Sequence, residues 1–177
     1  MKQILLPLAA AAAFITILGV LYKFPSATKN ALQNPEQFIE KAVETKVFNK
    51  REIKVGEVSI LVEVADTQEA RNKGLSGRDS IAENEGMLFV FEALDKKHAF
   101  WMKDMKFAID IIWINDGKIA QISKVVSPPD PGTPDRILPL YIPDAPADYV
   151  LEVAAGFSDK NGLITGNPVD LTSVLGK

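Results

Sequence analysis

The chain has 177 residues, no cysteine, one histidine (His98) and a formal net charge of −3. The lack of cysteine excludes disulfide scaffolds, thiol catalysis and Cys-ligated zinc or iron–sulfur sites, and one histidine cannot form a multi-histidine metal site within a chain. From these two counts we expect no metal and no cofactor. Nucleic-acid binding requires a basic surface, which a net charge of −3 does not indicate, so we also expect no nucleic-acid partner.

Residues 4–22 form an uncharged, apolar segment, ILLPLAAAAAFITILGVLY. As a helix it would be about 28 Å long, close to the thickness of a bilayer's hydrocarbon core. Two interpretations stay open, an uncleaved single-pass membrane anchor and a cleaved signal sequence. Proline at position 25 of Pro25-Ser26-Ala27 disfavours cleavage there. In either case we expect the remainder outside the cytoplasm, at the cell membrane or, after cleavage, secreted or periplasmic.

This pattern divides the chain into three parts: an anchor or signal over 1–27, a polar tether over 28–46, and a domain over 47–177. The tether contains a short predicted helix, QFIEKAVE at 37–44, opened by Asn34-Pro35-Glu36. The domain begins with two strands, 51–55 and 57–65, which flank Gly56 and predict a hairpin.

A capping box from Asp66 to Glu69 predicts a short helix that ends at Gly74. Strands are predicted over 86–91, 98–102, 108–114 and 118–126, and Asn115-Asp116-Gly117 forms a turn between the last two. Seven prolines between 127 and 147 exclude a helix or a central strand and predict a long surface loop.

The chain ends with a strand over 149–154 and a turn and strand within 162–171. Many short strands with turn signals and few helical segments predict an α+β, mainly β fold. We expect a compact, antiparallel-rich β-sandwich or barrel of about seven strands with one or two short helices.

Three carboxylates, Glu63, Asp110 and Glu152, lie inside apolar strands. Side chains alternate along a strand, so Asp110 shares a face with Ile112 and Ile114, and the opposite face is apolar as well. A buried charge needs a partner. The sequence therefore predicts that these acids pair with cations brought from elsewhere in the chain.

Arg71 and Arg78 bracket the end of the predicted helix, and an arginine can hold a carboxylate through two parallel hydrogen bonds. In a structural interpretation, one of them fixes the helix to the sheet through Asp110 or Glu152. In a functional interpretation, Arg71, Arg78, Trp101 and Lys103 line a pocket for a small polar or anionic ligand, and Asp110 orients the cations.

Two other functions remain open. Asp110 and Glu152, with Glu63 as an alternate, would serve a carboxylate-dependent hydrolase if two of them met in one open cleft. The proline-rich loop 127–147 would serve a structural or assembly protein as its partner-docking strip. The sequence contains no nucleophile-elbow motif (G-x-S-x-G) that would supply a serine for His98 to activate. His98 is therefore interpreted as a residue without a catalytic role.

Five ordered motifs carry a resemblance to a known family: VEVADTQEARNKGLSGR, GMLFVF, FWMKDM, IDIIWI before an Asp-Gly turn, and YVLEVAAG. Over about residues 58–169 the chain resembles the DUF192 family (UPF0127, COG1430). The resemblance implies a small β-rich domain, often behind a signal or anchor, without an established activity. The leading hypothesis remains an exported or membrane-anchored binding or accessory module, with an enzyme as its rival, and its motivation is the pairing of scarce arginines with a carboxylate in an apolar strand.

The chain departs from the usual pattern of that family at three places. Ser76 stands where methionine is common, Asp104-Met105 replaces Asn-Thr, and Phe107-Ala108 replaces a Pro-Leu-like pair. If a ligand contacts this stretch, its specificity is expected to differ here.

Overall fold

The computed structural model describes residues 50–176, which form one seven-stranded mixed sheet with the order β5-β4-β6-β3-β2-β1-β7. Neighbouring strands are antiparallel except β2 and β3, which run parallel. The strands are β1 (Lys50–Val55), β2 (Val58–Ala65), β3 (Glu85–Val90), β4 (Ile109–Asn115), β5 (Lys118–Val126), β6 (Tyr149–Ala154) and β7 (Val169–Asp170).

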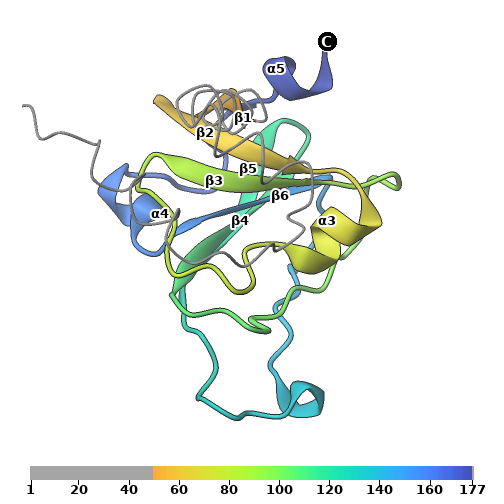
Figure 1. Cartoon of the computed structure of the whole chain (residues 1–177). Helices are drawn as coiled ribbons and strands as arrows, with labels where there is room; N and C mark the ends of the chain where they lie inside the picture. The colour runs from red at the N-terminus through yellow and green to blue at the C-terminus, as the bar shows by residue number, and fades with distance from the viewer. Residues whose placement is uncertain (1–49, 177) are drawn as a thin grey trace, which may run out of the picture. The chain divides into compact units, whose positions relative to one another are not determined.

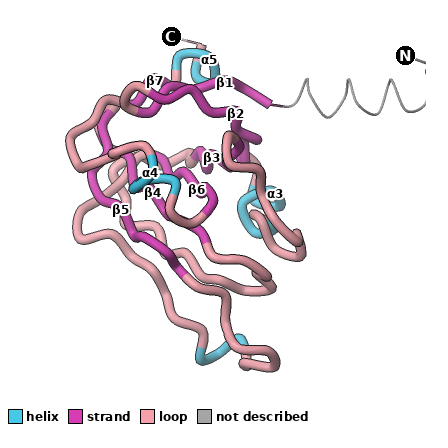
Figure 2. The backbone as a smooth tube through the Cα atoms, turned by 90° about the vertical axis from the view of Figure 1, so that its left-hand side faces the viewer, coloured by secondary structure: helices cyan, strands magenta, loops and turns pink. Residues whose placement is uncertain are grey.

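The sheet curls into a half-barrel, as Figures 1 and 2 show. At one end the curl brings the two edges together, because Lys118 at the start of β5 bridges Pro168, next to β7. The amide of Ile119 donates to the carbonyl of Asn167 at 2.9 Å. The predicted mainly β fold of about seven strands is confirmed.

Each face of the sheet carries its own apolar core. The concave side buries Leu88, Ile112 and Leu151 with residues from β1, β2 and β7. The opposite side buries a second cluster around Met87, Ile111 and Trp113, covered by segments that follow β2 and β3 and precede β4 and β6. Strands buried on both faces explain why the sequence shows apolar runs instead of strict alternation.

Within residues 50–176 three short α-helices decorate the sheet, one more than the upper expectation for the domain: α3 (Gln68–Lys73), α4 (Phe157–Lys160) and α5 (Thr172–Leu175). The predicted helix is α3, but its N-cap is Thr67 and not Asp66, since the Thr67 hydroxyl accepts from the Ala70 amide at 3.1 Å. It ends at Gly74 as predicted. There φ is 47° and an added Cβ would touch Phe89 at 3.4 Å, so glycine suits the position.

The predicted strand over 98–102 is wrong. This segment makes only an isolated bridge, in which Phe100 and Tyr141 exchange two backbone hydrogen bonds of 2.9 and 2.8 Å. It crosses over the second core, with Phe100 packed edge-on against Trp113. Its alternation of apolar side chains therefore reflects contact with a sheet face and not membership of the sheet.

The proline-rich segment 127–147 is a long loop, as predicted. It contains one 3₁₀ turn, η2 (Asp135–Ile137), at the tip that extends away from the sheet in Figure 1. The expectations for residues 1–46, including the anchor and the tether helix, lie outside the described residues. Within residues 50–176 no helix has the length and apolarity needed to cross a membrane.

Candidate functional site

The three strand-embedded acids are divided between the two faces of the sheet. Register places Glu63, Met87 and Glu152 opposite one another on β2, β3 and β6, so their side chains share the second face. Asp110 pairs with Val153 of the concave core and therefore lies on the other face. Asp110 and Glu152 thus do not form the acid pair that the hydrolase hypothesis predicted.

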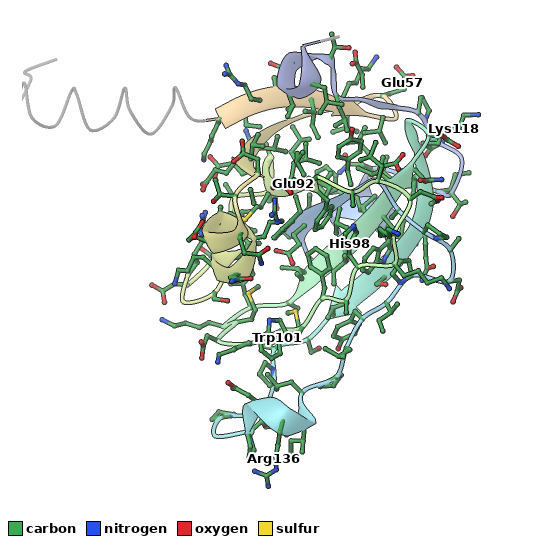
Figure 3. All side chains as sticks on the ribbon, turned by 90° about the vertical axis from the view of Figure 1, so that its right-hand side faces the viewer. Glu57, Glu92, His98, Trp101, Lys118 and Arg136 are labelled. Atoms are coloured by element: carbon green, nitrogen blue, oxygen red, sulfur yellow. The ribbon has the colours of Figure 1, made fainter. Side chains whose placement is uncertain are left out.

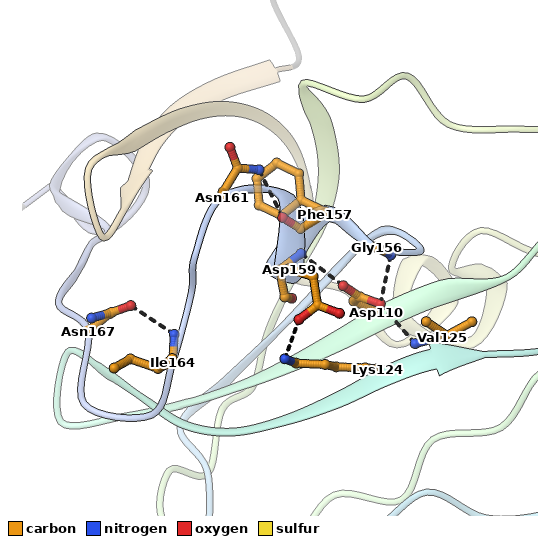
Figure 4. A network of polar contacts seen from close by, with 10 residues as sticks. Asp110, Lys124, Val125, Gly156, Phe157, Asp159, Asn161, Ile164 and Asn167 are labelled. Atoms are coloured by element: carbon orange, nitrogen blue, oxygen red, sulfur yellow. Dashed lines mark hydrogen bonds and ion pairs between the residues drawn. The ribbon is translucent and has the colours of Figure 1, made fainter.

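Asp110 is fully buried and its carboxylate is held by backbone amides. Oδ1 accepts from Val125 at 2.9 Å and from Gly156 at 3.1 Å, and Oδ2 accepts from Ser158 at 2.9 Å (Figure 4). The expectation that Asp110 holds or orients the arginines is wrong, because three N–H donors from β5 and the start of α4 already satisfy it. Its role is to fix that corner of the half-barrel.

Arg78 pairs with Glu63, and not with Asp110 or Glu152. Its Nη1 and Nη2 donate to Oε1 and Oε2 of Glu63 at 2.9 and 2.7 Å, a bidentate contact. This hydrogen bonding raises the pKa of Arg78, and the charges of Glu63, Glu85 and Glu152 act in the same direction. One arginine therefore does lock the segment after α3 onto the sheet, but through Glu63, so the partners that the structural interpretation named, Asp110 and Glu152, are wrong.

Glu152 lies next to this pair but is buried, with 6% of its surface exposed. Burial raises the pKa of Glu152 from 4.5 to about 8, while the charge of Arg78 acts in the opposite direction. At neutral pH its carboxyl group is therefore protonated. It does not line the cleft described next.

A cleft of about 680 Å³ lies between α3, the end of β3 and the segment before β4. It brings together three of the five residues that the sequence assigned to ligand binding, Arg71, Trp101 and Lys103. Arg78 and Asp110 are not among its lining residues. The remaining lining residues are Gln68, Asn72, Phe89, Phe91, Glu92, Ala93, His98, Ala99 and Phe100. Figure 3 shows Glu92, His98 and Trp101 from this side of the molecule.

Arg71 is held in a fixed orientation at this cleft. Its Nη1 donates to the carbonyl of Asp66 at 2.7 Å and to that of Val90 at 2.8 Å, which ties the start of α3 to the end of β3. Its guanidinium lies 5.8 Å from the ring centroid of Phe91, a cation–π contact. Within residues 50–176 neither Nε nor Nη2 of Arg71 makes a hydrogen bond.

Trp101 and Lys103 form another part of the cleft wall. Trp101 is 45% exposed, unusual for so large an apolar side chain, and the Lys103 ammonium lies 5.5 Å from its ring centroid. Lys103 also pairs with Asp135 of η2, and that hydrogen bond raises the pKa of Lys103. The loop 127–147 thus contacts the cleft through its tip.

His98 is the cleft residue whose importance the sequence did not reveal. Its ring stacks on Phe91 with centroids 3.5 Å apart and planes 9° apart. Burial lowers the pKa of His98, the charge of Arg71 lowers it further, and a backbone hydrogen bond to Ala93 acts against both. Its buried Nε2 has no hydrogen-bond partner within the described residues. His98 is therefore a neutral ring packed beside the Arg71 cation.

The family model for DUF192, described as "Uncharacterized ACR, COG1430", matches residues 49–171. The chain belongs to the DUF192 family. No curated protein matches it. Within residues 50–176, no group of three His, Cys, Asp or Glu side chains is placed to hold a metal ion.

The solved structures that resemble this DUF192 domain include the following two. One is a protein from Sinorhizobium meliloti 1021 described as a "putative transcription regulator", 26% identical, with a TM-score of 0.61 over 68% of this chain and 92% of that one. The other, a protein of unknown function from Novosphingobium aromaticivorans DSM 12444, is 24% identical, with a TM-score of 0.61 over 68% and 84%. The second likeness supports the fold alone.

Ser76 and Asp104, two positions at which a departure from the family pattern is expected, lie together beside the cleft. The Ser76 hydroxyl donates to the carbonyl of Lys103 at 2.8 Å, and the Gly77 amide donates to that of Asp104 at 2.9 Å. Asp104 has φ of 55°, a conformation that Asp and Asn tolerate better than most residues. These contacts fix the turn that carries Lys103, which lines the cleft.

Proposed function

We propose that this DUF192 domain is a binding or accessory module that takes a small anionic ligand in the cleft of Arg71, Trp101 and Lys103. The observation that carries the proposal is the convergence of two cations with exposed aromatic surface on one concave site. Ligand sites are typically clefts with mostly apolar walls and a few convergent polar groups. Glu92 is the one acid among the lining residues, and since Lys103 is paired with Asp135, Arg71 is the lining cation that makes no ion pair within residues 50–176.

The oriented guanidinium of Arg71 supports the proposal further. A cation that is already fixed by two backbone carbonyls loses little side-chain entropy when an anion binds, and preorganisation of this kind strengthens binding. The neutral ring of His98 beside it adds no competing charge at neutral pH. The cleft is therefore built to receive negative charge at Arg71.

The test is a titration of the full chain with acetate and with inorganic phosphate, followed by NMR at the imidazole of His98. Because the chain has one histidine, its signal needs no assignment. We expect either anion to shift the signal in wild type, and R71Q to abolish the shift. The control variant is R136Q, which replaces an exposed arginine at the loop tip (Figure 3). It should leave the shift of the His98 signal unchanged. Equal responses in R71Q and wild type would refute the proposal.

A carboxylate-dependent hydrolase is the second candidate, and one observation favours it. A buried carboxyl that stays protonated to about pH 8, such as that of Glu152, has the property required of a general acid. The assay is hydrolysis of chromogenic esters and glycosides by the full chain. Activity that is present in wild type and lost in E152Q would establish this candidate in place of the first.

We also propose that residues 4–22 carry the domain out of the cytoplasm, as an anchor or a cleaved signal, on the evidence of their length and apolarity. The mass of the mature protein tests this, because loss of about the first 27 residues indicates cleavage. A nucleic-acid role, which the description of the Sinorhizobium protein suggests, gains no support from a net charge of −3.

A further inference from the structure

The free side of the Arg71 guanidinium indicates which kind of anion the cleft prefers. Nη1 is occupied by the carbonyls of Asp66 and Val90, whereas Nε and Nη2, which point to one side as a fork, make no hydrogen bond within residues 50–176. Such a fork matches the two oxygens of a planar carboxylate through two parallel hydrogen bonds. The geometry therefore suits bidentate binding of one carboxylate.

The charge balance of the cleft favours a monoanion over a dianion. The lining contains two permanent cations, Arg71 and Lys103, and one acid, Glu92. Lys103 is already paired with Asp135. Arg71 is therefore the one lining cation that makes no ion pair within residues 50–176, and a single cation matches a carboxylate better than a phosphate monoester, whose charge at pH 7 is about −1.5 to −2.

The aromatic walls indicate what is attached to that carboxylate. Phe91 and His98 are stacked face to face, and Phe100 meets Phe91 edge-on with centroids 6.4 Å apart. Trp101 is 45% exposed in the same cleft. A ring packed against this surface would remove apolar aromatic surface from water. Pairs of aromatic rings also contribute stabilisation beyond the area that they bury.

We propose that the ligand is a monoanion in which a carboxylate is attached to a ring, with the carboxylate on Nε and Nη2 of Arg71 and the ring against Trp101. The inference rests on the proposed function, because it names the ligand class of the same cleft. An aromatic acid and a uronic acid share this chemistry. Benzoate and glucuronate therefore serve as the two probes, with acetate as the ringless carboxylate and inorganic phosphate as the anion whose average charge at neutral pH exceeds one.

The experiment titrates the full chain, in a non-ionic detergent, with each of the four anions, following the His98 signal and the heat of binding. We expect at least one ring acid to bind about tenfold more tightly than acetate, and phosphate to bind less tightly than that ring acid. W101A should lower the affinity for the ring acid to that of acetate while leaving acetate unchanged. R71Q should abolish binding of both, and R136Q should change neither.

Arg71 also supports the backbone, so R71Q is accompanied by R71K, which keeps the charge and loses the fork. We expect R71K to retain weak binding of every anion and to lose the preference for carboxylates. Thermal unfolding of each variant separates lost binding from lost structure. A preference for benzoate indicates an aromatic acid, and a preference for glucuronate indicates a sugar acid.

The outcomes separate the two proposals. Equal affinity for acetate and both ring acids, or an unchanged preference in W101A, would overturn the ring inference and leave the anion-binding function intact. Tighter binding of phosphate than of every carboxylate would overturn the carboxylate inference in the same way. No response to any of the four anions would overturn both.

Discussion

Asp110 and Glu152 are acids in similar sequence surroundings, yet they have different hydrogen-bond partners on the two faces of the sheet. Both interrupt apolar strands and both are buried, at 0% and 6% exposure. On the concave face Asp110 meets three backbone amides. On the other face Glu152 makes no hydrogen bond to a described residue, and its pKa rises to about 8. Burial alone therefore does not fix an acid's role; the donors around it do.

The difference has a local origin in the backbone. Val125 has φ of 51° and Gly156 has φ of 82°, so both peptides turn their N–H groups out of the regular ladder. Those groups need an acceptor, and Asp110 supplies it between β5 and α4 (Figure 4). Glu152 sits among regularly paired strands β3, β6 and β4, where the backbone amides are already used by the sheet.

The largest expected effect is the loss of the Asp110 carboxylate. D110A removes a charged acceptor from three backbone amides, one in a buried and two in partly buried hydrogen bonds. Each hydrogen bond to a charged group contributes about 1.5–3 kcal/mol, and because two of these are partly buried we expect the free energy of unfolding to fall by an amount near the low end of the sum, about 4–6 kcal/mol. D110N should cost about half as much, because one oxygen still accepts. Urea unfolding of the full chain measures both.

The matched control for Asp110 is D159N in the same corner. Asp159 pairs with Lys124, and both side chains are exposed. An exposed pair contributes about 0–1 kcal/mol, so this variant should stay close to wild type. A loss in D110A no greater than that in D159N would contradict the role given to the three amides.

The sequence predicted which face of the sheet a side chain occupies better than it predicted which side chains pair with one another between strands. Alternation placed Asp110 with Ile112 and Ile114, and the concave core confirms that placement. The partner of Arg78 could not be derived, because it depends on strand order and register, which bring Glu63 and Glu152 to the same row. Helices α4 and α5, of four residues each, are too short to show helical periodicity.

The cleft was predicted in part. Arg71, Trp101 and Lys103 were selected as scarce cations and an exposed aromatic residue, and all three line it. His98 was set aside because a lone histidine carries no local signal. Its stacking on Phe91 is a contact between the end of β3 and a segment that was predicted to be a strand. Because residues 98–102 were predicted to be a strand of the sheet, the sequence did not indicate that residues 98–103 lie close to α3.

The second expected effect concerns the pH dependence that Glu152 imposes. In the folded state Glu152 keeps its proton to about pH 8, whereas in the unfolded chain it ionises near 4.5. The folded state therefore binds more protons between these values, so the free energy of unfolding falls as pH rises from about 4.5 to about 8 and levels off above.

E152Q isolates this contribution, because the amide is neutral at every pH and similar in shape. We expect wild type and E152Q to differ little at pH 4, and the variant to be more stable by about 2–4 kcal/mol at pH 9. The control is E57Q, which replaces an exposed acid at the turn after β1 (Figure 3). A constant difference between wild type and E152Q from pH 4 to 9 would show that Glu152 is ionised in the folded state.

The smallest expected effect sharpens the account of Asp110. Ser158 is fully buried, its amide donates to Asp110 at 2.9 Å, and its hydroxyl has no hydrogen-bond partner within residues 50–176. S158A keeps the amide and removes an unpaired buried hydroxyl, whose burial is unfavourable. We therefore expect urea unfolding to show a change within about 1 kcal/mol, in favour of the variant. A loss well above that value would mean that the hydroxyl itself holds this corner together. The stability of the concave face would then depend on a side-chain partner as well as on backbone amides, and its contrast with Glu152 would weaken.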